Sequence, residues 1–271
     1  MPAGRYTHPV SLTFWKYQGL GNDFVVVETP ELMSAARAVR LCDRRRGIGA
    51  DGVLSLLPAQ QGAAAFMHVH NSDGSVAAMC GNGIRCVARH LAERRGLDGA
   101  LVIETGAGPK RCQVHRGPRG EVVAVSVEMG PARYEREQVF EVAGERLLAH
   151  RVSMGNPHAV FFGAATRERA SSLGPLLERA VPDGVNAGFA APRRGGLDLI
   201  VWERGAGLTE ACGTGACAAA VAAVKTGLLP PEAPLDVALP GGALQITVAA
   251  DLVGVVMRGP AERAFEGRTE L

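Results

Sequence analysis

The chain has 271 residues, of which 47% are hydrophobic, so it is long enough to bury one large core or two modest ones. Lys and Arg total 29 against 27 Asp and Glu, and a net charge of +2 supplies no broad positive field for binding nucleic acid or an anionic membrane. Because the sequence has neither a signal-peptide pattern at its start nor an apolar run of membrane-spanning length, we expect a cytoplasmic globular protein that acts on a small molecule.

Short β-branched runs bounded by turn residues recur along the chain and predict a strand-rich fold. The clearest are residues 23–28, 100–104, 121–128, 159–162 and 197–203. Near the C-terminus, residues 235–248 form two alternating runs joined by Gly241 and Gly242, a pattern typical of a β-hairpin. The sheet is therefore expected to contain antiparallel neighbours.

Two helices stand out in the pattern. The first begins near Cys80, and its apolar residues recur at helical spacing over residues 84–91 before Gly96 ends it. The second covers about residues 213–225 and is almost entirely Ala and Val. A helix that is apolar all round is a buried helix, so we expect the second helix to lie inside a sheet.

A partial internal repeat organises the chain. GNDF at residues 21–24 resembles GNPH at residues 155–158, and CGNG at residues 80–83 resembles CGTG at residues 212–215 at nearly the same offset. Two copies of one strand-rich unit with a central helix are therefore predicted. We place the boundary near residue 127, so that residues 1–126 carry Cys80 and residues 127–258 carry Cys212.

Cys80 and Cys212 both lie where a helix begins. The positive end of the helix dipole and the unpaired N–H groups at such a position lower the pKa of a thiol from about 8.5 toward neutrality. The following glycines let a ligand approach the backbone closely, and the free amides there are expected to hold a carboxylate. The four amides are those of Gly81, Asn82, Gly213 and Thr214.

If the repeat is a pseudo-two-fold, one thiol lies on each face of a bound Cα. Inverting a stereocentre through a planar carbanion requires a base on one face and an acid on the other, so one thiolate and one thiol are needed. Two helix ends that point at one carboxylate would also stabilise the negative charge that develops on it. The residues alone thus predict a racemase or epimerase for a small amino acid.

Metal and cofactor sites are the main alternatives for these motifs. The cysteine spacings inside the two helices match no usual zinc pattern. Residues 213–218 match a dinucleotide-binding fingerprint only formally, because no acidic residue closing a second parallel strand is evident. We therefore predict neither a metal nor a cofactor, and we interpret the other cysteines and the pair His68 and His70 as structural.

The assembled motifs resemble those of the diaminopimelate epimerase family. In the first half they are GLGNDF (residues 19–24), GIGADG (47–52), NSDGS (71–75), MCGNGIRC (79–86) and ETGAG (104–108). In the second half they are MGNPH (154–158), VNAGF (185–189), ERGAGLTEACGTGACA (203–218) and LPGG (239–242). The resemblance runs from about residue 14 to the end, and Asn82 separates the chain from proline racemases, which carry His there.

The resemblance implies an α/β fold of α+β type with two pseudo-symmetric domains, each a strongly curved, mostly antiparallel sheet around a central helix. It implies that residues 259–271 return to the first domain and that the protein is a homodimer. The implied reaction interconverts LL- and meso-diaminopimelate without a cofactor, for lysine and peptidoglycan-precursor synthesis. A related racemase with another amino-acid substrate and a non-catalytic amino-acid-binding protein remain as alternatives.

The resemblance also implies roles for individual residues. Cys80 and Cys212 match the acid/base pair, and the four amides named above match the binding site of the reacting carboxylate. The remaining substrate positions are Asn22, Asn71, Asn156, Asn186, Glu203 and Arg204, with Arg204 as a bidentate partner of the distal carboxylate. His158 and Glu203 match auxiliary positions that tune the protonation of the cysteines. Gly52 stands where some relatives place a substrate-contacting Gln, and roughly the first dozen residues are an extension.

Overall fold

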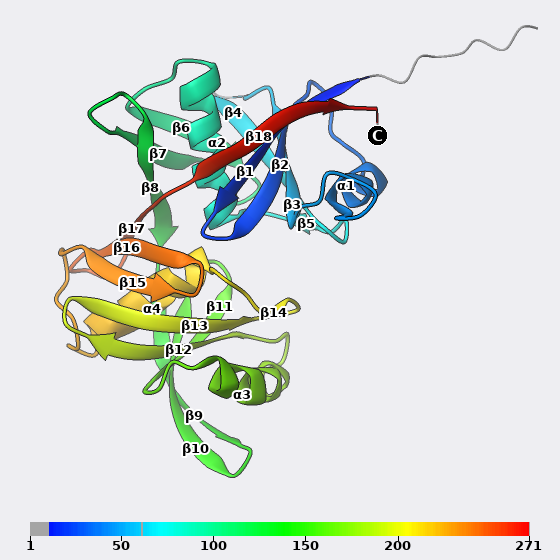
Figure 1. Ribbon diagram of the computed structural model, residues 1–271. Coiled ribbons are helices and arrows are strands. Elements are labelled where there is room, and N and C mark those ends of the chain that lie inside the picture. The colour runs from blue at the N-terminus through cyan, green and yellow to red at the C-terminus, as the bar shows by residue number, and fades with distance from the viewer. Residues whose placement is uncertain (1–10, 61, 271) are drawn as a thin grey trace, which may run out of the picture.

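The computed structural model describes residues 11–60 and 62–270, so most of the N-terminal extension lies outside the described residues. The first ten strands and helices, drawn in blue to green in Figure 1, build the first lobe and lead out of it through β8. They are β1 (Leu12–Gly19), β2 (Asn22–Glu28), α1 (Ala35–Cys42), β3 (Gly52–Leu57), β4 (Ala65–Asn71), β5 (Val76–Ala77), α2 (Gly81–Arg94), β6 (Ala100–Thr105), β7 (Lys110–Arg116) and β8 (Val122–Pro131).

The second lobe is drawn in green to orange, and the last strand returns from it to the first lobe (Figure 1). Its elements, followed by that last strand, are β9 (Arg133–Val142), β10 (Glu145–Ser153), β11 (Pro157–Phe162), α3 (Arg167–Arg179), β12 (Asn186–Arg193), β13 (Gly196–Glu203), β14 (Gly207–Leu208), α4 (Gly213–Lys225), β15 (Leu235–Leu239), β16 (Gly242–Val248), β17 (Gly254–Gly259) and β18 (Glu262–Thr269).

The two halves have the same order of elements. Strands β2 and β3 pair in parallel, as do β11 and β12, and the crossovers that contain α2 and α4 give the parallel pairs β4–β6 and β13–β15. The other pairings are antiparallel, including the hairpin β15–β16 that we predicted. This repeat of a mostly antiparallel sheet around a central helix confirms the predicted fold class.

Each sheet is wrapped around one of the two predicted helices. In α2, the apolar face expected from the spacing is fully buried at Ile84, Val87 and Leu91. In α4, the small side chains from Ala216 to Ala223 are buried on every side, because Ala and Val let the strands approach the helix axis closely. The predicted burial of this helix inside a sheet is thus confirmed.

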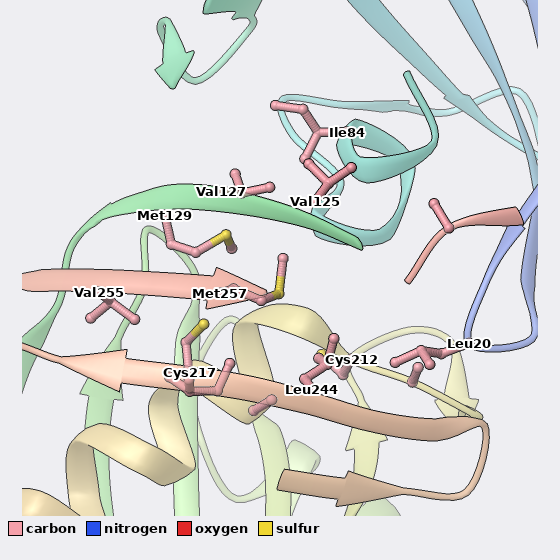
Figure 2. Close-up of a cluster of buried hydrophobic side chains, with 14 of the residues drawn as sticks. Leu20, Ile84, Val125, Val127, Met129, Cys212, Cys217, Leu244, Val255 and Met257 are labelled. Atoms are coloured by element: carbon pink, nitrogen blue, oxygen red, sulfur yellow. The ribbon is translucent and has the colours of Figure 1, made fainter. Parts of the chain in front are cut away.

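Strands β8 and β17 join the halves. They pair antiparallel, with Val127 opposite Met257, so one continuous sheet passes from one lobe to the other. Figure 2 shows Met129 and Met257 in this seam, with Ile84 of α2 on one side and Cys217 of α4 on the other. The predicted division between residues 126 and 127 falls inside β8 and stays a prediction.

The chain crosses the seam twice, once in each direction. After β8 it continues into β9, which pairs with β10 of the second half. After β17 it continues into β18, which pairs antiparallel with β1 of the first half, from Leu12 opposite Thr269 to Gln18 opposite Glu262. Each half therefore has its outer strand supplied by the segment that leaves the other half.

Helices α1 and α3 were not anticipated from the pattern. Helix α1 has only 8 residues and leaves much of its surface exposed, so its apolar periodicity is short. Helix α3 contains Gly174 and Pro175, two residues that disfavour a helix interior. Gly174 is needed because a Cβ there would lie 2.4 Å from Cγ of Trp202. Among the four helices of the described chain, none has the length and apolarity to cross a membrane.

Candidate active site

The two predicted cysteines are the N-cap residues of the two central helices. Cys80 has extended backbone angles before α2, and the amide of Gly83 donates a hydrogen bond to its Sγ at 3.3 Å. Cys212 has a similar conformation before α4, and its Sγ lies 3.7 Å from Oγ1 of Thr214. Both thiols therefore lie at the first turn of a helix, where Cys80 accepts a hydrogen bond from an amide and Cys212 contacts a hydroxyl without a side-chain cap bond.

The N-termini of α2 and α4 abut at two glycines. A Cβ placed on Gly81 would lie 3.7 Å from Cα of Gly213, and a Cβ on Gly213 would lie 3.7 Å from Cα of Gly81. Met257 closes this junction, because its Sδ would be only 3.0 Å from a Cβ on Gly213. The positive ends of both helix dipoles thus converge on one place, where they favour a bound anion.

Asn82 links the two halves beside Cys80. Its buried side chain donates from Nδ2 to the carbonyl oxygen of Ala211 at 3.1 Å and to Oδ1 of Asn22 at 3.3 Å. Asn22 in turn donates to Oδ2 of Asp51 at 2.7 Å. Because Ala211 directly precedes Cys212, these bonds tie the first-half amides to the start of the second-half helix.

A chain of hydrogen bonds connects the buried His158 to Cys212. Nε2 of His158 lies 3.1 Å from Oδ1 of Asn156, and because a carbonyl oxygen only accepts, Nε2 carries the proton. Asn156 donates from Nδ2 to Oγ1 of Thr214 at 3.3 Å. The Thr214 hydroxyl therefore has its proton available for the sulfur of Cys212. Burial, with nearby Arg151 and Arg204, lowers the pKa of His158 to about 3, so the ring is neutral.

Glu203 and Arg204 lie at the end of β13, next to Asn186. The backbone amide of Arg204 donates to Oδ1 of Asn186 at 3.0 Å, and Nδ2 of Asn186 donates to the carbonyl of Pro157 at 2.9 Å. Glu203 accepts a hydrogen bond from Oγ1 of Thr209 at 2.6 Å. The exposed guanidinium of Arg204 donates from Nη1 to the carbonyl of Asp183, a residue outside the predicted set.

The predicted direction of the two thiol pKa shifts is wrong. Burial raises the pKa of Cys80 and outweighs the N–H groups of Asn82 and Gly83, which lower it. The pKa of Cys212 lies well above its ordinary value, because burial and the carboxylate of Glu203 together exceed the effect of the Thr214 hydroxyl. The helix-end effect exists, but desolvation of a buried thiolate is larger.

Asn71 is a predicted site residue whose side chain bonds outside this hydrogen-bond network. It stands at the end of β4 opposite Gly52, and its Nδ2 donates to Oγ of Ser75 at 2.9 Å. No hydrogen bond from its side chain to another predicted site residue occurs within the described ranges. At Gly52, a Cβ would lie 2.7 Å from the carbonyl oxygen of His70, so a larger residue requires β4 to move.

Several residues of this network had no role in the sequence interpretation. They are Asp51, which holds Asn22, Thr209, which holds Glu203, and Arg85 and Met257 behind the helix junction. The first three lie inside motifs quoted above, but spacing does not reveal which side chain supports which. All six cysteines are free, and the described residues contain no group of three or more His, Cys, Asp or Glu that could hold a metal ion.

The fold is shared with amino-acid racemases and epimerases of known structure. A probable proline racemase from Agrobacterium radiobacter K84 aligns with a TM-score of 0.75 and 17% identity, covering 95% of this chain and 92% of that one. A hydroxyproline epimerase from Agrobacterium vitis aligns with a TM-score of 0.72 and 17% identity, covering 99% and 94%. The two-lobed sheet around two central helices is thus the fold that these two proteins have.

Sequence similarity identifies the family among the proteins that share this fold. The model of the diaminopimelate epimerase family matches residues 14–135 and 151–264. The diaminopimelate epimerase of Synechococcus sp. (strain JA-3-3Ab) is 45% identical, with 96% of this chain and 99% of that protein covered. The chain belongs to the diaminopimelate epimerase family, which confirms the resemblance found in its motifs.

Proposed function

We propose that this chain is a diaminopimelate epimerase that interconverts LL- and meso-diaminopimelate by proton transfer between two thiols. Its membership of the family supports the substrate. The observation that carries the mechanism is the pair of cysteines that precede two helices abutting at Gly81 and Gly213. A substrate Cα held at this junction has Cys80 on one face and Cys212 on the other.

In the forward step, one thiolate takes the proton from Cα and becomes a thiol, leaving a planar carbanion. The thiol on the opposite face then gives its proton to Cα and becomes the thiolate. Proton and charge are conserved, and the enzyme finishes with the two cysteines in exchanged protonation states. The reverse reaction uses the same two groups in the opposite order.

The reacting carboxylate binds at the converging helix ends. The amides of Gly81 and Asn82 on one side, and those of Gly213 and Thr214 on the other, are the donors. The negative charge that leaves Cα with the proton spreads onto this carboxylate, where prearranged amides stabilise it, as in an oxyanion hole. The reaction then needs no separate electron sink.

Substrate binding also makes the thiolate easier to form. The carboxylate of Glu203 raises the pKa of both Cys80 and Cys212. An ammonium group of the substrate placed at Glu203 neutralises this carboxylate and removes part of that increase. On the Cys212 side, the chain from His158 to Thr214 presents a hydroxyl proton to the sulfur, which stabilises its thiolate form.

The remaining predicted residues select the rest of the substrate. Diaminopimelate has a second ammonium group and a second carboxylate, which require acceptors and donors away from the junction. Arg204 offers a planar fork for the distal carboxylate, provided that its bond to the Asp183 carbonyl is exchanged for it. The side-chain amides that complete the set are Asn22, Asn71, Asn156 and Asn186.

Incubation of LL-diaminopimelate with the protein in D2O, without added cofactor, tests the reaction. We expect meso product with deuterium at the inverted Cα, because a thiol that exchanges with solvent delivers the new proton. Inverted product without deuterium contradicts the mechanism. Turnover of proline but not of diaminopimelate contradicts the substrate.

Removal of either thiol tests the two-base assignment. We expect Cys80→Ala and Cys212→Ala each to reduce epimerisation by about 1,000-fold or more, because one face of Cα then has no acid or base. Cys217→Ala is the matched control, since Cys217 is a fully buried cysteine of the same helix α4 and takes no part in the mechanism. Unimpaired turnover in Cys80→Ala or Cys212→Ala refutes the proposal.

The wider setting follows from the family resemblance. We propose that the protein is a cytoplasmic homodimer that serves lysine and peptidoglycan-precursor synthesis. Residues 1–126 with 259–271 form one half of each protomer, and residues 127–258 form the other. Light scattering on the purified protein measures the oligomeric state, and a monomeric mass at working concentration contradicts the dimer.

A further inference from the structure

Arg85 is a buried cation behind the candidate active site. It lies in α2, five residues after Cys80, and is the largest of the fully buried side chains in the described chain, with 0% of its surface exposed. A charged side chain in such a place is normally paired with an opposite charge. The ion pairs found among the described residues do not include Arg85.

The guanidinium is held instead by neutral acceptors. Nη1 donates to the carbonyl of Gly81 and Nη2 donates to Oδ1 of Asn82, each at 3.1 Å. Nε donates at 3.1 Å to the carbonyl of Pro260, on the segment that returns to the first half. Nη1 also donates to Sδ of Met257 at 3.6 Å. Two of the three oxygen acceptors thus belong to the residues that follow Cys80 directly.

Two glycines pack against the guanidinium. A Cβ on Gly19 would lie 3.2 Å from Nη2 of Arg85, and a Cβ on Gly259 would lie 3.1 Å from its Nε. The planar group therefore has little room to move. Its bond to Oδ1 of Asn82 also fixes which way that amide turns, so that Nδ2 points toward Asn22 and Ala211.

The ionisable neighbours of Arg85 are thiols. Cys80, Cys86 and Cys217 are the groups whose negative charge would act on it. Of these, Cys86 and Cys217 are fully buried, and burial raises the pKa of each to about 12, so they stay protonated. Burial raises the pKa of Cys80 as well, but the N–H groups of Gly83 and Asn82 and the charge of Arg85 act against this rise. Because Cys80 is also partly exposed, it is the neighbour that can become anionic during turnover.

We propose that Arg85 is a positioning residue that fixes the Gly81 peptide and the Asn82 amide for the substrate carboxylate, and that it is the permanent positive charge balancing the Cys80 thiolate. The proposal rests on the function proposed above but extends it to a residue that does not touch the substrate. It also explains the missing carboxylate partner, because a fixed anion at Arg85 would cancel the charge that the thiolate and the substrate require.

Alkylation of Cys80 in the substrate-free protein tests the charge without relying on turnover. The rate of iodoacetamide labelling of the Cys80 peptide is followed by mass spectrometry from about pH 7 to about pH 10. The charged groups that act on Cys80 are Glu203 and Arg85, and Arg85→Met removes only the second. For Arg85→Met we expect labelling of Cys80 to be about tenfold slower near pH 7, because the curve of labelling rate against pH moves to higher pH by about one pH unit.

Measurement of kcat/KM separates the effect of the Arg85 charge from the effect of its planar guanidinium. Arg85→Lys keeps the charge but loses the three-way donor geometry, so we expect the labelling profile to stay in place while kcat/KM falls about tenfold. Arg85→Met should lose about 100-fold in kcat/KM through displacement of Asn82. If Arg85→Met does not fold, Arg85→Lys still tests the positioning role. An unchanged kcat/KM in Arg85→Lys overturns that role.

Arg89→Met is the matched control. Arg89 lies one turn later in α2 and donates to the carbonyl of Ala261 on the same returning segment, but it is paired with Glu93 at 2.7 Å. We expect its labelling profile and kcat/KM to match the wild type. An equal effect of Arg89→Met, or an unmoved profile in Arg85→Met, overturns the inference. Failure of wild-type epimerisation instead overturns the proposed function and leaves the labelling result valid.

Discussion

Gly241→Ala should separate the two halves at one edge of the active site. A Cβ on Gly241 would lie 2.0 Å from the carbonyl oxygen of Leu20 and 2.7 Å from its carbonyl carbon, which are backbone atoms of the turn between β1 and β2. Because Gly241 belongs to the turn between β15 and β16, the two turns must move apart by about 1 Å or more to reach normal contact. No side-chain rotation relieves this overlap.

The cost follows from what the two turns hold together. Leu20 is only 6% exposed and packs against Gly242, and burial of a Leu side chain contributes about 1.5–3 kcal/mol. Overpacking adds strain of similar size, so we expect a loss of about 2–4 kcal/mol and a fall in Tm of about 5–15 °C. The amide of Gly241 also donates to the carbonyl of Glu210 at 2.9 Å, two residues before Cys212.

A kinetic effect should also remain where the loss of stability no longer matters. A displacement of about 1 Å at a reacting group costs on the order of 100-fold in rate, so we expect that fall in kcat/KM at a temperature where the variant is fully folded. Gly254→Ala serves as the control, because its φ is not positive and the added Cβ would lie 3.3 Å from Cβ of Ala249. Wild-type Tm and kcat/KM in Gly241→Ala would refute the reasoning.

Two further predictions concern protonation around Cys212. Thr214→Val removes the hydroxyl that lowers the pKa of Cys212, so the acid limb of the pH–rate profile should move up by about one unit in the direction of turnover that uses Cys212 as base. Thr214→Ser keeps the hydroxyl and should keep the profile. The pKa of His158 is about 3 when folded, below its unfolded value of about 6.5, so stability present above pH 6.5 should be lost on acidification by up to about 1.4 kcal/mol per pH unit. Denaturant unfolding at several pH values should give a shallower slope for His158→Gln, and parallel curves would contradict this account.

The helices and thiols of the centre were predictable because their signal is local. The positions of Cys80 and Cys212 follow from a cysteine, two glycines and an apolar helix, a pattern that occurs twice. Their meeting could be inferred only through the repeat, and the abutting glycines Gly81 and Gly213 are consistent with that inference. A pattern that recurs in one chain thus carries information about three-dimensional symmetry.

The features that escaped prediction depend on contacts between distant segments. The sign of the thiol pKa shifts is set by burial, which results from both lobes closing on the site, whereas the helix-end effect is visible locally. Gly241 lies in the predicted hairpin turn, but the turn does not explain why it is a glycine: positive φ occurs at Gly242, and Gly241 has no side chain because Leu20 approaches it. The role of Arg85 could not be predicted from local spacing, because its acceptors include the carbonyl of Pro260, 175 residues further along the chain.

The return of β18 to β1 has a consequence for the order in which the protein can fold. Nε1 of Trp15 donates to Oε2 of Glu266 across 251 residues of chain. At a synthesis rate of about 5–20 residues per second, β1 exists for roughly 10 to 50 seconds before its outer neighbour is made. During that time the unpaired backbone N–H and C=O groups at this edge of β1 are open to pairing with other nascent chains. The first lobe therefore stays incomplete until β18 has been made, and a nonsense mutation before β18 would expose this edge permanently.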